Sequence, residues 1–161
     1  MSTRNVAPAF IPKYVGQFKC VGAECEDTCC AGWAVLLDKE TVSKYRDIDS
    51  RRPGSKLRSN IELIPSTNRS TQAFGRIRMK SGGACPFLGA DRLCEIQSKF
   101  GQSLLSRTCA QYPRSTAAYD GMVQQSLSPS CPEAARLLLL APDAMDIEIG
   151  ALDANTGRQV Q

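Results

Sequence analysis

Eight cysteines and no histidine constrain this 161-residue chain more than any other feature of its sequence. Without His, the chain cannot form a Ser-His-Asp triad, an HExxH zinc protease, a Cys-His protease pair or a Cys/His zinc finger. The cysteines form one dense group and then a series of wider spacings: Cys20, Cys25, Cys29, Cys30, Cys85, Cys94, Cys109 and Cys131. Any chemistry of this chain therefore depends on thiols, carboxylates, hydroxyls and basic side chains.

The length and composition favour one cytoplasmic domain that neither crosses a membrane nor binds nucleic acid. With 42% hydrophobic residues the chain has enough apolar side chains for a modest core, and its net charge of +4 is too small to indicate nucleic acid. No apolar run is long enough for a signal peptide or a transmembrane helix. In a reducing compartment so many thiols favour metal binding, although a disulfide framework remains the alternative.

The cysteine spacing favours a metal centre without identifying it. The pattern C-x4-C-x3-C-C, then C-x8-C-x14-C and a last cysteine, lacks the C-x2-C pairs of zinc ribbons and the run typical of bacterial ferredoxins. Eight thiols would serve two four-cysteine sites, or one cluster with the other thiols packed in the core. If residues 25–29 are helical, Cys25 and Cys29 share a face and Cys30 points elsewhere.

Periodicity and capping signals predict a set of short elements. We expect a strand or turn over residues 32–37, a helix from Lys39 to about Ile48 capped by Asp38, and strands over 61–64 and 72–80. Helices are expected over 93–100, ended by Gly101, and over 102–109. Strands are expected over 121–128 and 145–149, and Ser130 with Glu133 has the form of a capping box for a helix to Leu140.

These elements predict an irregular, mainly helical α+β fold, stabilised by metal. The metal-binding domain is expected to span residues 1–140, followed by a short strand and a disordered tail within 141–161. The loop 49–70 is expected to be the most flexible part. Between Thr41 and Lys80 ten basic residues stand against three acidic ones, which indicates a solvated face or a docking surface for an acidic protein partner.

Three blocks of the sequence resemble the amino-terminal part of the flagellin lysine-N-methylase family. The matching segments are FKCVGAECEDTCCAGW at 18–33 with Leu37, Asp38, Thr41 and Tyr45, then CPFL at 85–88, LCEIQ at 93–97, LSRTC at 105–109, YPR at 112–114 and SCPEAAR at 130–136. The cysteine pattern is also similar to the wider YkgJ-like family of zinc- or iron-chelating proteins.

The resemblance implies methylation of lysine ε-amino groups on flagellin, with S-adenosylmethionine as methyl donor and a [4Fe-4S] cluster. All eight cysteines stand where that family has its cysteines, and zinc is the alternative metal. Family members are typically more than twice as long as this chain. A truncated copy, or a cluster-bearing module without its catalytic domain, is therefore an open interpretation, as is a non-catalytic metal-binding interaction module.

The implied methyl transfer suggests roles for residues that flank the cysteine blocks. The lysine amine must lose its proton before it attacks the methyl group, which makes Asp27 and Tyr112 candidate catalytic groups. Arg114 is a third catalytic candidate, placed beside the cluster by the Tyr-Pro-Arg turn. Trp33 is a candidate wall of the cofactor pocket and Arg107 a candidate partner for the cofactor carboxylate. Each of these residues has a purely structural alternative, and the chain lacks the Gly-rich loop of Rossmann-like methyltransferases.

Overall fold

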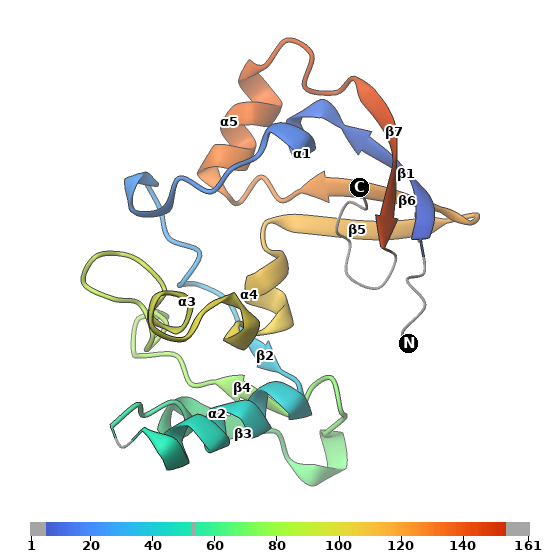
Figure 1. Ribbon diagram of the computed structural model, residues 1–161. Helices are drawn as coiled ribbons and strands as arrows, with labels where there is room; N and C mark the ends of the chain where they lie inside the picture. Colours follow the sequence, from blue (N-terminus) through green and yellow to red (C-terminus); the bar gives the residue numbers. More distant parts are fainter. Residues whose placement is uncertain (1–5, 53, 154–161) are drawn as a thin grey trace. The chain divides into compact units, whose positions relative to one another are not determined.

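The computed structural model describes residues 6–52 and 54–153. The chain folds into two compact units (Figure 1). The terminal unit combines Met1–Asp27 with Tyr112–Gln161, and the central unit comprises Thr28–Gln111. The polypeptide therefore passes from one unit to the other twice.

A four-stranded sheet in the order β5-β6-β1-β7 forms the terminal unit. β1 pairs parallel with β6 and antiparallel with β7, while β5 and β6 form a hairpin. The hairpin turns at Asp120 and Gly121, whose φ angles of 47° and 80° match the positive values that tight hairpin turns require. The strand bounds are β1 Val6–Pro12, β5 Arg114–Tyr119, β6 Met122–Leu127 and β7 Ile147–Asp153.

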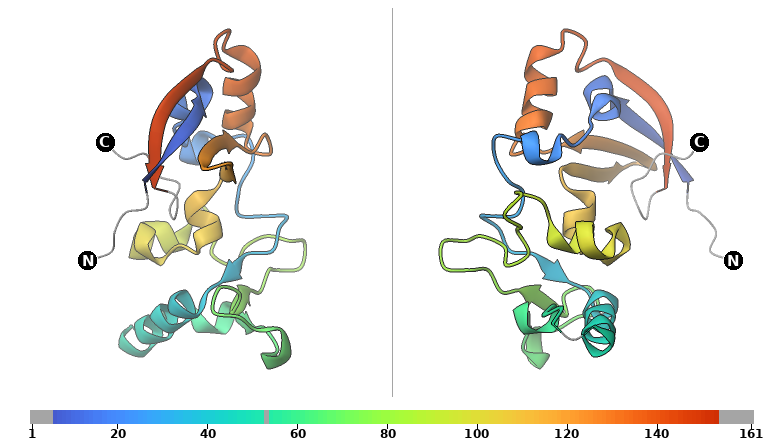
Figure 2. Two further views of the ribbon diagram at one scale, coloured as in Figure 1. Left: turned by 90° about the vertical axis from the view of Figure 1, so that its right-hand side faces the viewer. Right: turned by 60° about the vertical axis from the view of Figure 1, so that its left-hand side comes forward.

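Two helices, α1 (Lys13–Gln17) and α5 (Pro132–Leu140), lie on the same side of this sheet (Figure 2). Their apolar side chains pack with the inward residues of the strands into one core. The Tyr14 hydroxyl also accepts a hydrogen bond from the backbone amide of Leu127 at 3.1 Å, which ties α1 to β6. The buried core residues are Ala9, Ile11, Tyr14, Val15, Phe18, Val123, Leu127, Cys131, Ala134, Ala144 and Leu152.

A three-stranded antiparallel sheet in the order β2-β4-β3 and helix α2 organise the central unit. Asp38 caps α2 by accepting a hydrogen bond from the backbone amide of Thr41 at 2.6 Å. Gly75 in β4 leaves little room for a side chain, because a Cβ atom would lie 3.1 Å from a methyl carbon of Ile61. The bounds are β2 Leu36–Leu37, α2 Lys39–Arg51, β3 Ile61–Leu63 and β4 Gly75–Ile77.

Two short helices complete the central unit, α3 (Glu95–Phe100) and α4 (Arg107–Gln111). Gly101 follows α3 with a φ of 88°, a conformation that glycine adopts more readily than other residues. Single turns of 3-10 helix occur at Gly22–Glu24, Arg58–Asn60, Ser66–Asn68 and Gln102–Leu104. The core of this unit consists of Val35, Leu37, Val42, Tyr45, Leu57, Ile61, Ile77, Cys85, Phe87 and Ile96.

The structure confirms an α+β class and corrects the expectation that the chain is mainly helical. Sequence patterns missed β1, α1 and β5, which complete the terminal unit. The predicted capping box is wrong: Cys131 is the residue before α5, no side chain caps that helix, and Glu133 pairs with Arg136 instead.

The structure confirms several other expected elements and shortens or shifts others. The helix capped by Asp38, the end of α3 at Gly101 and strand β6 are confirmed. The strand expected over 145–149 is found as β7 at Ile147–Asp153. The strand expected over 72–80 is reduced to Gly75–Ile77. In the predicted tail, Asp153 belongs to β7 and residues 154–161 lie outside the described residues. Among the helices of the described part, none is long and apolar enough to cross a membrane.

A thiol cluster as the candidate functional site

The central unit brings several cysteines that are distant in sequence to one hydrophobic core. Three of these thiols, on Cys30, Cys94 and Cys109, are partly buried and pack against that core, and Cys85 belongs to it. All eight cysteines of the chain are thiols rather than disulfides. We call the five cysteines of the central unit the thiol cluster: Cys29, Cys30, Cys85, Cys94 and Cys109.

Cys30 lies at the centre of the cluster. Its thiol forms hydrogen bonds with Cys29 and with Cys94, which come from a turn and from the residue before α3. Because Cys30 stays protonated, these bonds lower the pKa of Cys29 to about 7 and that of Cys94 to about 6. The same two bonds raise the pKa of Cys30 far above its ordinary value. The cluster therefore pairs one protonated thiol with two neighbours that ionise near neutral pH.

Backbone pairing holds these residues in place. The backbone amide of Cys85 donates to the carbonyl oxygen of Cys30 at 2.7 Å, and Ala31 forms a β-bridge with Ala84. A second bridge joins Leu88 to Cys94. The two chain segments that carry Cys30 and Cys85 therefore run side by side, with the segment of Cys94 next to them.

Cys85 is the buried thiol of the cluster, and Cys109 is half-buried. Burial raises the pKa of the Cys85 thiol. Burial also raises the pKa of Cys109 to about 11, although a hydrogen bond with Ser106 opposes the shift. The backbone amide of Cys109 donates to the Ser106 hydroxyl at 3.1 Å, in the manner of a helix cap at the start of α4.

Tyr45 of α2 closes the cluster on the core side. Its hydroxyl donates to the carbonyl oxygen of Leu104 at 2.8 Å, and its ring is buried. Burial, followed by the negative charges of Cys109 and Cys94, raises the pKa of the Tyr45 phenol well above its ordinary value. The phenol therefore stays protonated beside the thiols.

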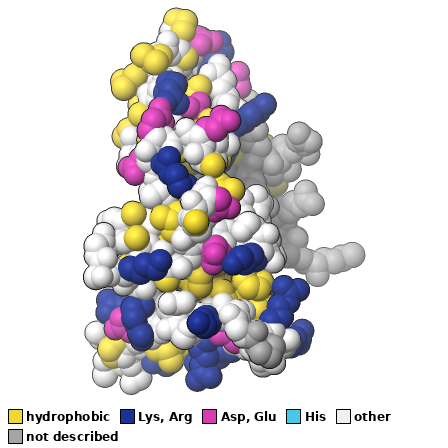
Figure 3. Space-filling model, turned by 90° about the vertical axis from the view of Figure 1, so that its left-hand side faces the viewer, with side chains coloured by type: hydrophobic (Ala, Val, Ile, Leu, Met, Phe, Trp, Pro, Cys, Tyr) yellow, Lys and Arg dark blue, Asp and Glu magenta, His cyan; other side chains and the backbone are white. Residues whose placement is uncertain are grey.

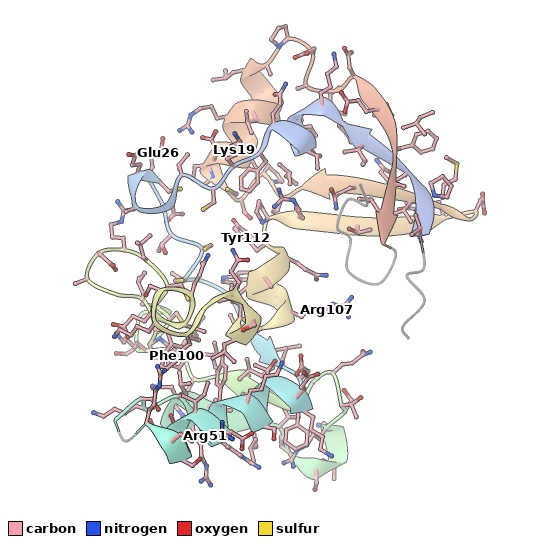
Figure 4. The ribbon with its side chains drawn as sticks, viewed as in Figure 1. Lys19, Glu26, Arg51, Phe100, Arg107 and Tyr112 are labelled. Carbon is pink, nitrogen blue, oxygen red and sulfur yellow. The ribbon has the colours of Figure 1, made fainter. Side chains whose placement is uncertain are left out.

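The two predicted cofactor residues lie in different parts of the central unit. The Trp33 indole N–H donates to the carbonyl oxygen of Cys29 at 2.8 Å, so Trp33 contacts the turn of the cluster. Arg107 is the first residue of α4 and is exposed (Figure 4). The structure thus brings Trp33 to the thiol cluster and gives Arg107 a surface position two residues before Cys109.

The three predicted catalytic residues all belong to the terminal unit. The Tyr112 hydroxyl lies 3.2 Å from the Ser130 hydroxyl, which in turn lies 2.8 Å from that of Ser128. Arg114 begins β5, with its guanidinium 5.1 Å from the centre of the Phe18 ring. Asp27 is exposed at the end of the unit's first segment.

The remaining cysteines, Cys20, Cys25 and Cys131, also belong to the terminal unit. Cys20 is exposed, Cys25 is half-buried and Cys131 is part of the hydrophobic core. Residues 25–29 are not helical: Cys25 follows the turn Gly22–Glu24, and Cys30 contacts Cys29 instead of pointing elsewhere. The expectation of a shared helical face for Cys25 and Cys29 is therefore wrong.

The donor chemistry of the thiol cluster suits a soft metal, but its present arrangement is not a ligand cage. Thiols are the ligands that zinc and iron-sulfur clusters prefer, and four of the five lie in or against one core, while Cys29 is exposed. Nevertheless, within residues 6–52 and 54–153, no three Cys, Asp or Glu side chains are placed so that they could hold a metal ion. The thiols of Cys29, Cys30 and Cys94 bond to one another instead.

Sequence reasoning missed two hydroxyls that support the cluster. The Thr28 hydroxyl accepts from the backbone amide of Cys30 at 3.1 Å, and Ser106 does the same for Cys109. The available signal was a Ser or Thr placed two or three residues before a cysteine, which is the spacing of side-chain caps and turns.

Comparison with known proteins relates the chain to flagellar and methylating proteins. It is 40% identical over 135 residues to the flagellar biosynthetic protein FliU of Salmonella muenchen, a match that covers 83% of this chain and 78% of that protein. It is 39% identical over 135 residues to the lysine-N-methylases of Salmonella typhimurium and Salmonella choleraesuis.

The match covers 33% of each lysine-N-methylase, so the chain spans about a third of their length. No family model matches the sequence, and no solved structure matches it. The likeness to FliU extends over most of both proteins. The chain therefore belongs to the family of FliU and the lysine-N-methylases.

Proposed function

We propose that this chain is the metal-binding part of a system that methylates lysine ε-amino groups of flagellin, with S-adenosylmethionine as methyl donor. The observation that carries the proposal is the 39% identity to proteins named lysine-N-methylase. The gathering of four thiols in or against one core, with Cys29 adjacent to Cys30, supports a metal centre in the same region. We place the reaction in the cytoplasm, where thiols remain reduced.

Within this proposal the thiol cluster holds the metal centre. Four of Cys29, Cys30, Cys85, Cys94 and Cys109 would provide the ligands of a [4Fe-4S] cluster, or three if one iron stays open, with zinc as the alternative. When bound, the centre would cross-link the turn at Cys29 to α3 and α4, or offer an iron site to the methionine end of the cofactor. Cys20, Cys25 and Cys131 belong to the terminal unit and would not be ligands of this metal centre.

The remaining site residues would handle the amine and the methyl donor. The lone pair of the neutral lysine amine attacks the methyl carbon, the bond from that carbon to sulfur breaks, and S-adenosylhomocysteine leaves as a neutral thioether. The lysine ammonium must release a proton before the attack, because only the neutral amine has a free lone pair. The hydroxyl chain from Tyr112 through Ser130 to Ser128 offers one route for that proton, and Asp27 offers a carboxylate.

We assign the positive charge of Arg107 to the cofactor carboxylate, because guanidinium groups bind carboxylates through paired hydrogen bonds. Trp33 would wall the methionine side of the cofactor next to Cys29. Arg114 lies on Phe18 in the terminal unit and would bind an anionic group of the substrate or cofactor there.

A second candidate function is a non-catalytic zinc- or iron-binding module that contacts another protein. The observation that favours it is coverage, because the match accounts for only 33% of each lysine-N-methylase. In this case the methyl-transfer residues would lie on another polypeptide, and this chain would supply the metal centre.

One experiment distinguishes these two candidate functions. It combines reconstituted protein with flagellin and with S-adenosylmethionine that carries a labelled methyl group. Methylation is expected to transfer label to flagellin lysines, as located by mass spectrometry. The matched control is the Cys94→Ser variant, which should lose both metal and transfer. Transfer by neither protein, together with an intact metal centre in the wild type, would favour the non-catalytic module.

A further inference from the structure

The central unit carries a strong positive charge that the thiol cluster does not use. Residues 28–111 contain fourteen Lys and Arg against seven Asp and Glu, whereas the rest of the chain has six against nine. The central unit thus has a charge of +7 and the terminal unit a charge of −3. Figure 3 shows Lys and Arg side chains gathered over the part formed by α2, β3 and β4, with few acidic ones between them.

Many of these cations have no acidic partner. Lys44, Arg76 and Lys99 do form ion pairs, with Glu40, Glu62 and Glu95. Between residues 46 and 80 of the described ranges, six other exposed cations form neither an ion pair nor a contact with an aromatic ring. We call them the basic surface: Arg46, Arg51, Lys56, Arg58, Arg78 and Lys80.

The backbone of the basic surface is held in place by hydrogen bonds. The Asp49 carboxylate on α2 accepts from the backbone amides of Leu57 at 3.0 Å and Arg58 at 2.7 Å, and also from the Ser55 hydroxyl. This carboxylate is thus occupied by the turn, and it fixes the turn after α2 to the helix.

The same turn is joined to strand β4. The Asn60 side chain donates to the carbonyl oxygen of Lys56 at 2.9 Å, and the backbone amide of Arg78 donates to the carbonyl of Asn60 at 2.8 Å. Lys56 has a φ of 53°, a left-handed conformation that costs free energy for residues other than glycine. The fold therefore keeps a lysine at a strained position between Arg51 and Arg58.

The chemistry around the basic surface suits carboxylates better than nucleic acid. Proteins that bind single-stranded nucleic acid commonly combine a basic groove with exposed aromatic rings on which the bases stack. Here the Phe74 and Phe100 rings are each covered by an arginine, Arg69 at 4.7 Å and Arg52 at 5.8 Å from the ring centre. The arginines that remain open, such as Arg58 and Arg78, present planar groups that bind carboxylates in pairs.

We infer that the basic surface binds an acidic segment of a protein, and that this segment belongs to the protein substrate. The second part rests on the proposed function, and it assigns the surface the task of holding the substrate while a lysine is methylated. Binding itself is measured without any methyl transfer. Failure of the docking surface and failure of the methylation proposal therefore give different results.

The test uses the full chain and a short fluorescein-labelled peptide of alternating Glu and Ser, followed by fluorescence anisotropy. Binding is expected to weaken about tenfold from low to physiological salt, because exposed charges are screened. The double variant Arg58→Glu/Arg78→Glu is expected to lose about tenfold or more in affinity. The control Lys19→Glu/Lys39→Glu makes the same change in net charge outside the basic surface and should lose far less.

Three results would overturn the inference. The peptide fails to bind the wild-type chain, or both double variants lose the same affinity, which would indicate a general charge effect. Alternatively, a labelled oligothymidylate binds the same surface more tightly than the peptide, which would indicate nucleic acid. Thermal unfolding followed by circular dichroism verifies that Arg58→Glu/Arg78→Glu still folds, and the single variant Arg78→Glu replaces it otherwise.

Discussion

The indole N–H of Trp33 donates a hydrogen bond to the carbonyl oxygen of Cys29 at 2.8 Å. This bond closes the turn that carries the adjacent cysteines, Cys29 and Cys30. The same turn is held on its other side by the Thr28 hydroxyl and by the amide of Cys85. The only tryptophan of the chain thus supports the thiol cluster by positioning its backbone.

Trp33→Phe is expected to loosen this turn. The variant keeps an aromatic ring and loses one hydrogen bond, which is worth about 1 kcal/mol of unfolding free energy. Urea unfolding of metal-free protein, followed by circular dichroism, measures the change. The exposed ring of Tyr119 offers a control in Tyr119→Phe. Equal unfolding free energies for Trp33→Phe and the wild type would show that this bond contributes nothing to the turn.

The thiols are expected to react in a fixed order as the pH rises. In metal-free protein, Cys94 and Cys29 have pKa values of about 6 and about 7, so both are largely thiolate slightly above neutral pH. Cys109 is half-buried and, with a pKa of about 11, stays protonated. Alkylation by iodoacetamide at increasing pH, mapped by mass spectrometry, gives the order directly. Labelling of Cys109 before Cys94 contradicts the arrangement around Cys30.

Asp49→Asn is expected to destabilise the turn at neutral pH by about 1–2 kcal/mol, since the amide nitrogen cannot accept the bonds that the carboxylate accepts. Burial raises the pKa of Asp49, but the bonds from Ser55 and the amides of Arg58 and Leu57 outweigh it, so the net pKa is lowered. Because the pKa of Asp49 is lower in the folded than in the unfolded protein, its carboxylate stabilises the fold fully at a pH above the unfolded-state pKa of about 4. This stabilisation is lost as the pH falls through the folded-state pKa.

Urea unfolding of wild type and Asp49→Asn as a function of pH measures this dependence. The difference between the two proteins should be full near neutral pH and shrink in acid as the Asp49 carboxylate protonates. The exposed Asp47 on the same helix provides a control in Asp47→Asn. A difference that stays constant down to acidic pH would mean that Asp49 acts through packing and not through its charge.

Tyr112→Phe is expected to slow methyl transfer if Tyr112 belongs to the proton route. The variant removes the hydroxyl that lies 3.2 Å from Ser130 while it keeps the ring. General acid-base groups typically contribute about 100-fold or more to the rate, so the loss should appear in kcat with little change in KM. Single-turnover transfer to flagellin measures it, with Tyr119→Phe as control. An unchanged kcat assigns Tyr112 a structural role.

Local patterns predicted the elements that carry their own signals. Asp38 has the short side chain and position of a helix cap, and Gly101 tolerates positive φ, so both ends were readable from the sequence. The missed hairpin also had a signal, because Asp120-Gly121 is a strong turn pair. β1 had none, since its partners β6 and β7 lie more than one hundred residues away in the sequence.

The site was predicted by residue type and not by arrangement. The cysteine pattern indicated a thiol site, but the sequence could not tell that Cys30 contacts both Cys29 and Cys94. That contact depends on the β-bridges between Ala31 and Ala84 and between Leu88 and Cys94, which are tertiary pairings. The Ser130 capping box failed for a related reason: the Ser130 hydroxyl contacts Tyr112 and Ser128 rather than the start of α5.

We propose that the thiol cluster of the central unit holds a metal centre. The most direct test of this claim is the iron, zinc and acid-labile sulfide content of anaerobically purified wild type, Cys94→Ser and Cys20→Ser. We predict about four irons and four sulfides per chain in the wild type, or zinc without sulfide, lost in Cys94→Ser and retained in Cys20→Ser. A metal-free wild type, or metal that persists in Cys94→Ser, would contradict the claim.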